Sequence, residues 1–227
     1  MKWIHWTVEL AGINEILGGM PKSEDLIVGQ MASKEIRLRA KAMGRDPERI
    51  IADNLNTIGI EAGMEEIVDE EKMSCGFRRS ADQALCLGAH QIQSLLLDAM
   101  TTLRLGQKVR GLKDTLARGT LVTQPGTEPG LLKMQGDSAG TVEQPTGTLE
   151  WGSQVTDRSG SRAILRRYDY VKPWRLAFTV KYPDTGILTV EIWKDLWEMS
   201  EVQGLGAARP RGYGKFSVVS NIKSKEN

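Results

Sequence analysis

A short stretch near the C-terminus, residues 203–219 with the sequence QGLGAARPRGYGKFSVV, combines glycines with cationic side chains. Glycine tolerates positive φ angles, and successive exposed N–H groups in such a turn form a concavity that binds anions. Arginine and lysine add charge-assisted hydrogen bonds to phosphate. The stretch predicts a phosphate-binding loop; the alternative is that its glycines only permit a tight return of the chain. The residues concerned are Gly204, Gly206, Arg209, Arg211, Gly212, Gly214 and Lys215.

The spacing of these glycines differs from that of a nucleotide-binding P-loop. The pattern GxxxxGK[ST] is absent, and the stretch follows an expected helix and precedes an expected strand. A P-loop has the reverse order, which places the phosphate at the N-terminus of the helix. The stretch is therefore not predicted to bind a nucleotide in that way.

Charge separates along the chain although the net charge is only +1. Residues 48–71 hold eight acidic side chains against Arg49 alone, whereas residues 102–175 hold twelve basic side chains against seven acidic ones. Basic segments on a neutral protein are compatible with a phosphate-binding face, and solvated faces are the alternative. These segments supply further candidate residues: Lys108, Arg110, Lys113, Arg166, Arg167, Lys172 and Arg175.

Side chains with the chemistry of acids, bases or metal ligands are few and scattered. His5 lies inside an expected strand and His90 opens an expected helix, so both are predicted to be structural. Asp25 is a single unpaired acid in an early loop. The acidic run from Glu61 to Glu71 points to different faces of a helix, which favours a solvated face over a metal site. The sequence predicts no catalytic residue, no metal and no cofactor.

The composition predicts a globular protein. The 227 residues, 40% hydrophobic and 26% charged, are enough to bury a core. No window approaches 18 uninterrupted apolar residues, and the start MKWIHWTVEL lacks the apolar core of a signal peptide, so no membrane association and a cytoplasmic location are expected. Cys75 and Cys86 do not have CxxC spacing and are expected to be reduced, buried thiols.

The first half of the chain predicts one strand followed by helices. Residues 2–10 alternate between apolar and polar side chains, which indicates a strand, and glycines and Pro21 then form a loop. Short helices are expected from Ser33 and from Pro47. The clearest helix covers residues 90–105, where apolar residues recur at spacings of three and four.

The second half predicts several strands, one helix and a last strand. Residues 123–147 are rich in proline and glycine and are expected to form a long loop or irregular hairpin rather than core. Strands are expected at 149–157 and 161–171, joined by a turn at 158–160, and at 174–182. A helix over 187–204 would place Ile192, Leu196 and Met199 on one stripe and bring Trp193 near Trp197, and a strand would follow at 214–220. This order predicts an α+β, ferredoxin-like (RRM-like) βαββαβ core with a large helical and loop insertion.

The ending GLGAARPRGYGKFSVV, placed between a helix and the last strand, resembles the glycine-rich loop of the RAMP superfamily, the RNA-binding proteins of CRISPR systems. The form RGYGKF is most similar to that of the subunits that build the repeating backbone of CRISPR effector complexes. The ending and the start VELAGINEILGGMP are also similar to phage-encoded proteins of unassigned role. The resemblance covers roughly the first 20 and the last 60 residues, and residues 22–150 match no pattern.

The resemblance implies a single RAMP-like domain over residues 1–227, with a core at about 1–20 and 148–220 and an insertion at about 22–147. It also implies that the loop lies beside single-stranded RNA or DNA, with other effector subunits or further copies as partners. The basic groove would gain from aromatic stacking, for which Tyr168, Tyr170, Trp174 and Tyr213 are candidates. For Trp174 a place in the core is the better interpretation.

Three functions follow from these patterns. The first is non-catalytic binding of single-stranded nucleic acid, most simply RNA, by a CRISPR-type or phage ribonucleoprotein, in a role such as antiviral defence. The second is a metal-independent endoribonuclease of the same fold that processes guide RNA, with His5 or His90 as its general base. The third is a protein-interaction module that mimics a CRISPR subunit and uses the acidic run as its contact surface.

Overall fold

The computed structural model describes residues 2–21, 74–137, 140–157 and 160–225. The chain divides into two compact units. The first unit comprises Met1–Gly19, Phe77–Thr148 and Asp169–Asn227, and the second comprises Met20–Gly76 and Leu149–Tyr168. The helices expected from Ser33 and Pro47, together with Asp25 and the acidic run, lie outside the described residues.

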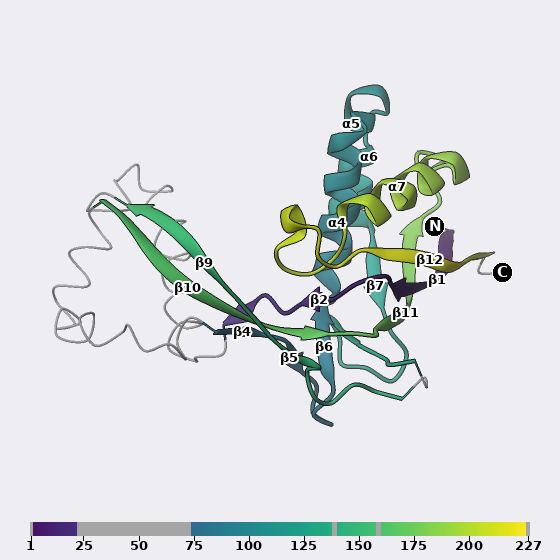
Figure 1. Cartoon of the computed structure of the whole chain (residues 1–227). Coiled ribbons are helices and arrows are strands. Elements are labelled where there is room, and N and C mark those ends of the chain that lie inside the picture. The colour runs from purple at the N-terminus through teal and green to yellow at the C-terminus, as the bar shows by residue number, and fades with distance from the viewer. Residues whose placement is uncertain (1, 22–73, 138–139, 158–159, 226–227) are drawn as a thin grey trace, which may run out of the picture. The chain divides into compact units, whose positions relative to one another are not determined.

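The first unit contains a four-stranded antiparallel sheet with two helices (Figure 1). The helix α4 (Ala89–Thr102) lies between the first and second of these strands in the sequence, and α7 (Val190–Gln203) lies between the third and fourth. The fourth strand pairs with the first, the first with the third, and the third with the second, which is the ferredoxin-like arrangement predicted from the sequence. In sheet order the strands are β12 (Phe216–Lys225), β1 (Trp3–Gly12), β11 (Arg175–Pro183) and β7 (Leu121–Thr123).

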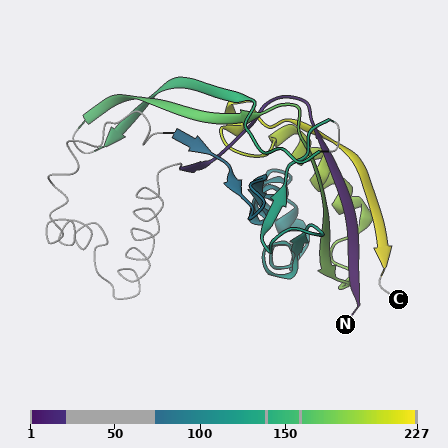
Figure 2. The same ribbon diagram turned by 90° about the horizontal axis from the view of Figure 1, so that it is seen from below.

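The strand β1 forms because its residues alternate between apolar and polar side chains. Ile4, Trp6, Val8 and Leu10 are buried, and the residues between them are not. The strand pairs along its whole length with β11 on one side and β12 on the other, so that β1 begins where β12 ends (Figure 2). The predicted strand and its buried face are confirmed.

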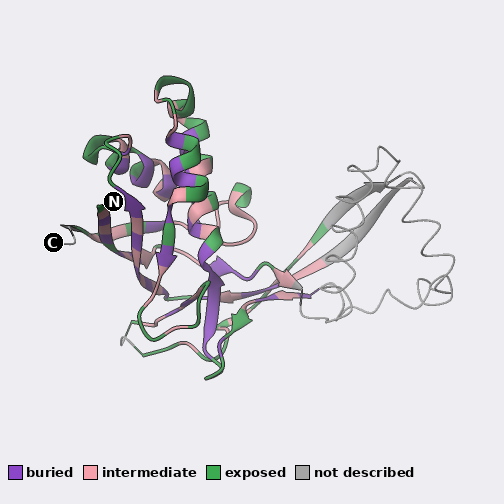
Figure 3. Ribbon diagram, turned by 180° about the vertical axis from the view of Figure 1, so that it is seen from behind, coloured by how far each residue is buried: buried purple, intermediate pink, exposed green. Residues whose placement is uncertain are grey.

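The helix α4 packs through the apolar stripe that the sequence predicts. Its fully buried residues are Ile92, Leu95, Leu96 and Ala99. The helix ends before Arg104, whose φ of 55° lies in the left-handed region. Figure 3 shows buried and exposed residues alternating along this helix, as expected of a helix with one face on the core.

The helix α7 faces the core differently from the prediction. Its first turn is capped by the Thr189 side chain, which accepts a hydrogen bond from the Ile192 N–H. The buried residues are Trp193, Leu196, Trp197 and Ser200, whereas Ile192 and Met199 are only partly buried. The predicted stripe was therefore misplaced by about one position, because both tryptophans turn inward as a pair. The centroids of their rings lie 5.6 Å apart, and the ring planes are inclined at 80° to each other.

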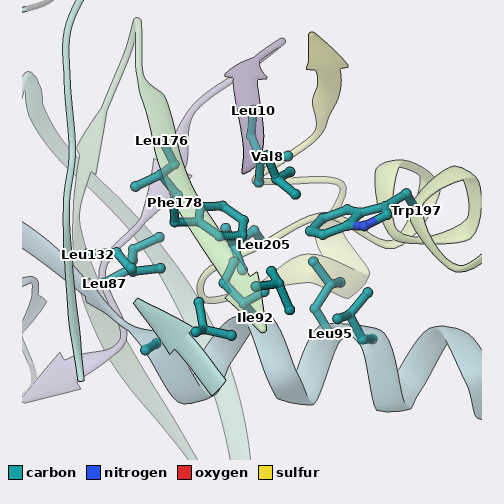
Figure 4. Close-up of a cluster of buried hydrophobic side chains, with 14 of the residues drawn as sticks. Val8, Leu10, Leu87, Ile92, Leu95, Leu132, Leu176, Phe178, Trp197 and Leu205 are labelled. Atoms are coloured by element: carbon teal, nitrogen blue, oxygen red, sulfur yellow. The ribbon is translucent and has the colours of Figure 1, made fainter. Parts of the chain in front are cut away.

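The core of this unit lies between the sheet and the two helices. Val8 and Leu10 from β1, Phe178 from β11 and Ile92 from α4 meet there with Trp197 from α7 (Figure 4). Burying each such side chain contributes about 1.5–3 kcal/mol. Leu205, which follows α7, points into the same cluster and is 1% exposed.

The segment between β7 and β9 contributes to the core, contrary to the sequence-based prediction for residues 123–147. It contains β8 (Leu131–Lys133), which pairs with β6 (Leu85–Gly88), and β6 pairs in turn with β5 (Arg78–Arg79). Leu132 and Met134 are fully buried. The prolines and glycines of this segment therefore bend a chain that still supplies core side chains.

The core also takes residues from the range that the sequence assigned to an insertion. Both α4 and β7 lie within residues 22–147, yet they supply the first helix and the second strand of the ferredoxin-like arrangement. Any insertion is thus shorter than predicted, whereas the extent of the domain as a whole stays a prediction.

The second unit contains most of a long β-hairpin. The strand β9 (Gly147–Asp157) pairs with β10 (Gly160–Val171), as the turn chemistry at 158–160 predicts. At Arg167 and Tyr168, β10 also pairs in parallel with β4 (Ser74–Gly76), which pairs with β3 (Met20–Pro21). Within the first unit, the end of β10 pairs with β2 (Ile16–Leu17).

Two further expectations concern the thiols and the membrane. Cys86 is buried, as expected, whereas Cys75 is only half-buried. In the part of the chain that the structure describes, no helix combines the length and the apolar character needed to cross a membrane.

Candidate nucleic-acid interface

The glycine loop, residues 204–215 between α7 and β12, is packed closely against backbone atoms at three of its glycines. A Cβ at Gly204 would lie 2.7 Å from the Tyr213 carbonyl oxygen, and a Cβ at Gly206 would lie 2.8 Å from the Leu17 carbonyl oxygen. A Cβ at Gly214 would overlap the Leu205 carbonyl oxygen. All three residues have positive φ angles. Glycine is therefore required at these positions to fold the loop, whatever the loop binds.

The amides of the loop are largely engaged within the chain. Gly204 donates its N–H to Ser200 O at 2.9 Å, Gly212 to Arg209 O at 2.9 Å, and Gly214 to Glu15 O at 2.8 Å. An anion-binding concavity of exposed amides, as predicted from the sequence, is therefore not formed by these three glycines. The loop's cationic side chains are the better candidates for contact with phosphate.

Asn14 fixes the glycine loop to the segment that follows β1. Its side-chain amide donates to the Gly212 carbonyl at 2.7 Å, and its side-chain oxygen accepts from the Lys215 N–H at 2.8 Å. Its own carbonyl accepts from the Trp174 indole N–H at 2.8 Å. Sequence reasoning missed Asn14, because nothing in the local pattern shows that it meets residues about 200 positions away.

A cleft of about 570 Å³ lies beside the loop, between the C-terminal ends of α4 and α7. This volume falls in the range of small-molecule sites, which is roughly 300–1,000 Å³. Its wall combines two cations with hydroxyl, amide and apolar groups. The residues that line it are Asp98, Thr101, Thr102, Val202, Gln203, Arg209, Pro210 and Lys215.

Both cations of the cleft are held by acceptors of the same chain. The Arg209 guanidinium forms an ion pair with Asp98 at 2.9 Å, and the two side chains are 32% and 50% exposed. The Lys215 ammonium donates to the Val202 carbonyl in the last turn of α7, where the helix dipole favours a cation. Arg211 is exposed in the same short turn as Arg209.

A group of exposed cations, the basic tip, follows α4 directly. It covers residues 104–118 and includes α5 (Leu105–Lys108) and α6 (Leu112–Asp114). Asp114 is its one acidic residue. Among the described residues, none forms an ion pair with the tip's cations, so no carboxylate of the described segments neutralises their charge. These cations are Arg104, Lys108, Arg110, Lys113 and Arg118.

The basic tip begins next to the cleft. Thr102 lines the cleft, and Arg104 is the second residue after it. The tip therefore starts from the end of α4 that lines the cleft, and Figure 1 shows α5 and α6 following that end. Lys108, Arg110 and Lys113 were predicted from the sequence, whereas Arg104, Arg118 and the cleft residues of α4 and α7 were not.

The remaining predicted cations are paired. Lys172 contacts Glu15 at 3.0 Å, and the pKa of Glu15 is lowered by a hydrogen bond to its own backbone and by this lysine. Arg175 contacts Glu9 at 3.2 Å. In the second unit, Arg167 contacts Glu150 at 2.5 Å.

The predicted aromatic candidates have different surroundings. Arg166 of the second unit donates to the Tyr168 hydroxyl at 3.4 Å, and the Tyr168 ring stacks on Trp151 at 4.6 Å. Trp174 is 1% exposed, as expected of a core residue. Tyr170 and Tyr213 are both half-buried.

The sheet face opposite the helices is a poor platform for stacking bases. The central pairs of β1 and β11 on that face are Thr7 with Thr179 and Glu9 with Ala177. RRM domains bind RNA through aromatic side chains at such positions. The cleft and the basic tip are therefore better candidates for binding a polyanion than this face of the sheet.

The described residues hold no group of metal ligands, and the two histidines lie in separate elements. His5 lies within β1, and His90 lies in the first turn of α4, where burial and the charge of Arg78 lower its pKa. No three His, Cys, Asp or Glu residues of the described segments are grouped as metal ligands. Neither histidine is thus shown to have a catalytic role.

Comparison with known proteins finds a likeness in structure but not in sequence. No protein-family model matches the sequence, and no curated protein matches it. The structure is similar to a chain in the cryo-EM structure of the Type III-B Cmr-beta bound to cognate target RNA, with a TM-score of 0.50 and 10% sequence identity. The likeness is one of fold. It covers 99% of this chain but only 61% of the other, and it supports the RAMP resemblance at the level of fold alone.

Proposed function

We propose that this protein binds single-stranded nucleic acid without catalysis, through the glycine loop, the cleft and the basic tip. The main support is the run of exposed cations in the tip, which no described carboxylate neutralises, next to a cleft that holds Arg209 and Lys215. Several cations in line are the arrangement that neutralises successive phosphates of a strand. The glycines act by shaping the loop, so that its cations reach the cleft.

RNA is the proposed ligand, because the structural neighbour belongs to a complex bound to target RNA. A CRISPR-type or phage ribonucleoprotein, with this chain as one of its subunits, is the setting that agrees with the sequence resemblance. Arg166, Arg167, Lys172 and Arg175 would contribute only if their present partners, among them Glu150, Glu15 and Glu9, released them.

The experiment is a salt titration of binding to a fluorescently labelled 30-nucleotide single-stranded RNA, followed by anisotropy. For single strands, the slope of log K against log salt is about −0.7 for each phosphate neutralised. The loop variant R209A/R211A/K215A and the tip variant K108A/R110A/K113A should each make the slope shallower by about 2. A DNA strand of the same sequence tests the preference for RNA.

The matched control is R78A/R79A/K133A, which also removes three positive charges. Arg78 and Arg79 lie in β5, which pairs with β6, and Lys133 lies in β8, on the other side of β6. Because β6 leads directly into α4, the 14 residues of that helix, about 21 Å, separate these cations from the helix end where the cleft and the tip begin, more than twice the Debye length of about 8 Å at physiological salt. If the control weakens RNA binding as much as the loop and tip variants do, the affinity for RNA depends only on the total charge of the protein, and the proposed interface is wrong.

A further inference from the structure

The ion pair between Asp98 and Arg209 lies at the cleft, where a phosphate would have to bind. Asp98 comes from α4 and Arg209 from the glycine loop, and both line the cleft. The Asp98 carboxylate accepts from the Arg209 guanidinium and so occupies a donor that an entering anion would otherwise use. At the same time it holds the guanidinium in one orientation, since Arg209 donates to the Asp98 carboxylate at 2.9 Å.

Because both side chains of the ion pair are partly exposed, a competing anion can displace Asp98 from Arg209. Asp98 is 50% exposed and Arg209 is 32% exposed, so water screens their attraction. Exposed ion pairs of this kind typically contribute about 0.2–1 kcal/mol, which corresponds to a factor of roughly 1.4 to 5 in an equilibrium constant. A phosphodiester offers the guanidinium another charge-assisted partner with matching geometry.

The rest of the cleft suits a phosphate with an attached sugar. Lys215 gives its ammonium to a neutral carbonyl and so keeps its full charge for an incoming anion. The hydroxyl of Thr102 and the amide of Gln203 are already bonded to each other at 2.8 Å, which leaves the arginine and the lysine as the main phosphate donors. Val202 and Pro210 supply apolar surface beside them.

We propose that the cleft binds one phosphodiester of the nucleic-acid strand through Arg209 and Lys215, and that Asp98 competes with this phosphate for Arg209. The inference rests on the proposed function and adds a residue that limits affinity. Asp98 lowers the affinity for RNA without touching it, because each bound strand must first displace it from Arg209. Neutralising Asp98 therefore strengthens binding, and it does so only while Arg209 is present.

The test is a double-mutant cycle with D98N, R209A and D98N/R209A, measured by anisotropy with the labelled 30-nucleotide RNA between 50 and 300 mM salt. D98N should bind about 1.4- to fivefold more tightly, with an unchanged slope, because Arg209 pairs with phosphate in both proteins and D98N removes only the cost of displacing the carboxylate. R209A should bind more weakly with a shallower slope. The double variant should equal R209A.

The control for a general charge effect is E143Q. Glu143 is exposed, and its backbone carbonyl accepts a hydrogen bond at 2.8 Å from Arg79 of β5, which pairs with the strand that leads into α4. The length of this 14-residue helix, about 21 Å, separates its N-terminal end from the cleft and from the start of the basic tip. E143Q should bind RNA as the wild type does, and thermal unfolding should show both single variants to be folded.

The outcomes separate the inference from the proposed function. If the wild type binds RNA but D98N matches E143Q, or gains affinity equally in the R209A background, the competition by Asp98 is disproved and RNA binding stands. If neither the wild type nor D98N binds RNA at 50 mM salt, both proposals are wrong.

Discussion

Replacing Gly214 by alanine tests whether the glycine loop is built by close backbone approach. Gly214 has a φ of 73°, and a Cβ there would overlap the carbonyl oxygen of Leu205. Because the obstructing atom belongs to the backbone, a side-chain rotation cannot relieve the overlap. The chain must move, and the hydrogen bonds from Leu205 N–H to Gly214 O and from Gly214 N–H to Glu15 O, both 2.8 Å, are lost or stretched.

The expected cost follows from these two effects. An alanine in the left-handed region costs about 1–2 kcal/mol. The two hydrogen bonds contribute about 0.5–1.5 kcal/mol each, which brings the destabilisation by G214A to about 2–5 kcal/mol. The matched control is G212A, because Gly212 has a φ of 90° in the same loop but no atom within 4 Å of a Cβ. That variant should cost only about 1–2 kcal/mol.

Equilibrium unfolding in urea measures both variants. Trp193 and Trp197 lie in the core beneath the loop and report the transition by fluorescence. The free energies of unfolding should differ by about 1–3 kcal/mol, with unchanged m-values. Two variants within 0.5 kcal/mol of each other would show that Gly214 is required only for its φ angle, and the close packing of the loop would be wrong.

Three further predictions concern the same unit. N14A should destabilise the protein by about 1–3 kcal/mol in urea unfolding, because the Gly212 carbonyl and the Lys215 N–H lose their partner; an unchanged midpoint would contradict this. L95A should cost about 2–5 kcal/mol because Leu95 is fully buried, whereas V202A, at a residue 65% exposed, should change the free energy of unfolding by less than about 0.5 kcal/mol. Folding lowers the pKa of Glu15 below its usual 4.5, through a hydrogen bond to its own backbone and through Lys172, so its charge stabilises the folded state above that pH and the benefit disappears as pH falls through the lowered pKa. The stability difference between wild type and E15Q, followed by thermal unfolding from pH 7 to pH 3, should therefore shrink with acidification, and a constant difference would disprove the assignment.

Local sequence patterns correctly predicted the elements in which apolar residues recur at a regular spacing. The alternation of β1 places Val8 and Leu10 on the buried face, and the spacing of Ile92, Leu95 and Leu96 places α4 on the core. Both elements have a single buried face, so the sequence pattern alone determines which side chains turn inward. The ferredoxin-like order then follows from the succession of strands and helices.

The errors lie where contacts between distant segments decide the outcome. Ile192 and Met199 fit an apolar stripe, but aromatic packing of Trp193 against Trp6, with ring centroids 5.3 Å apart, turns α7 to another face. Leu132 and Met134 lie among prolines and glycines, yet they are buried because β8 pairs with β6. Contacts between segments that are distant in the sequence leave no periodic pattern in either segment, so sequence reasoning could not predict them.

The candidate site was foreseen in residue type but not in geometry. Arg209 and Lys215 were identified because cations interrupt a glycine-rich stretch, and both line the cleft. Their partners, Asp98 and the Val202 carbonyl, come from two helices about 100 residues apart in the sequence. The glycines were predicted to form an anion-binding concavity, whereas in the structure three of them are needed for close backbone packing.

Photo-crosslinking tests the central claim, that a nucleic-acid strand lies along the cleft and the basic tip. The purified protein would be bound to single-stranded RNA that contains 4-thiouridine, irradiated, and digested for mass spectrometry. The account predicts that the cross-linked peptides come from residues 98–118 and 203–215. Cross-links confined to β1, β11 and β12, or an absence of cross-links at low salt, would contradict it.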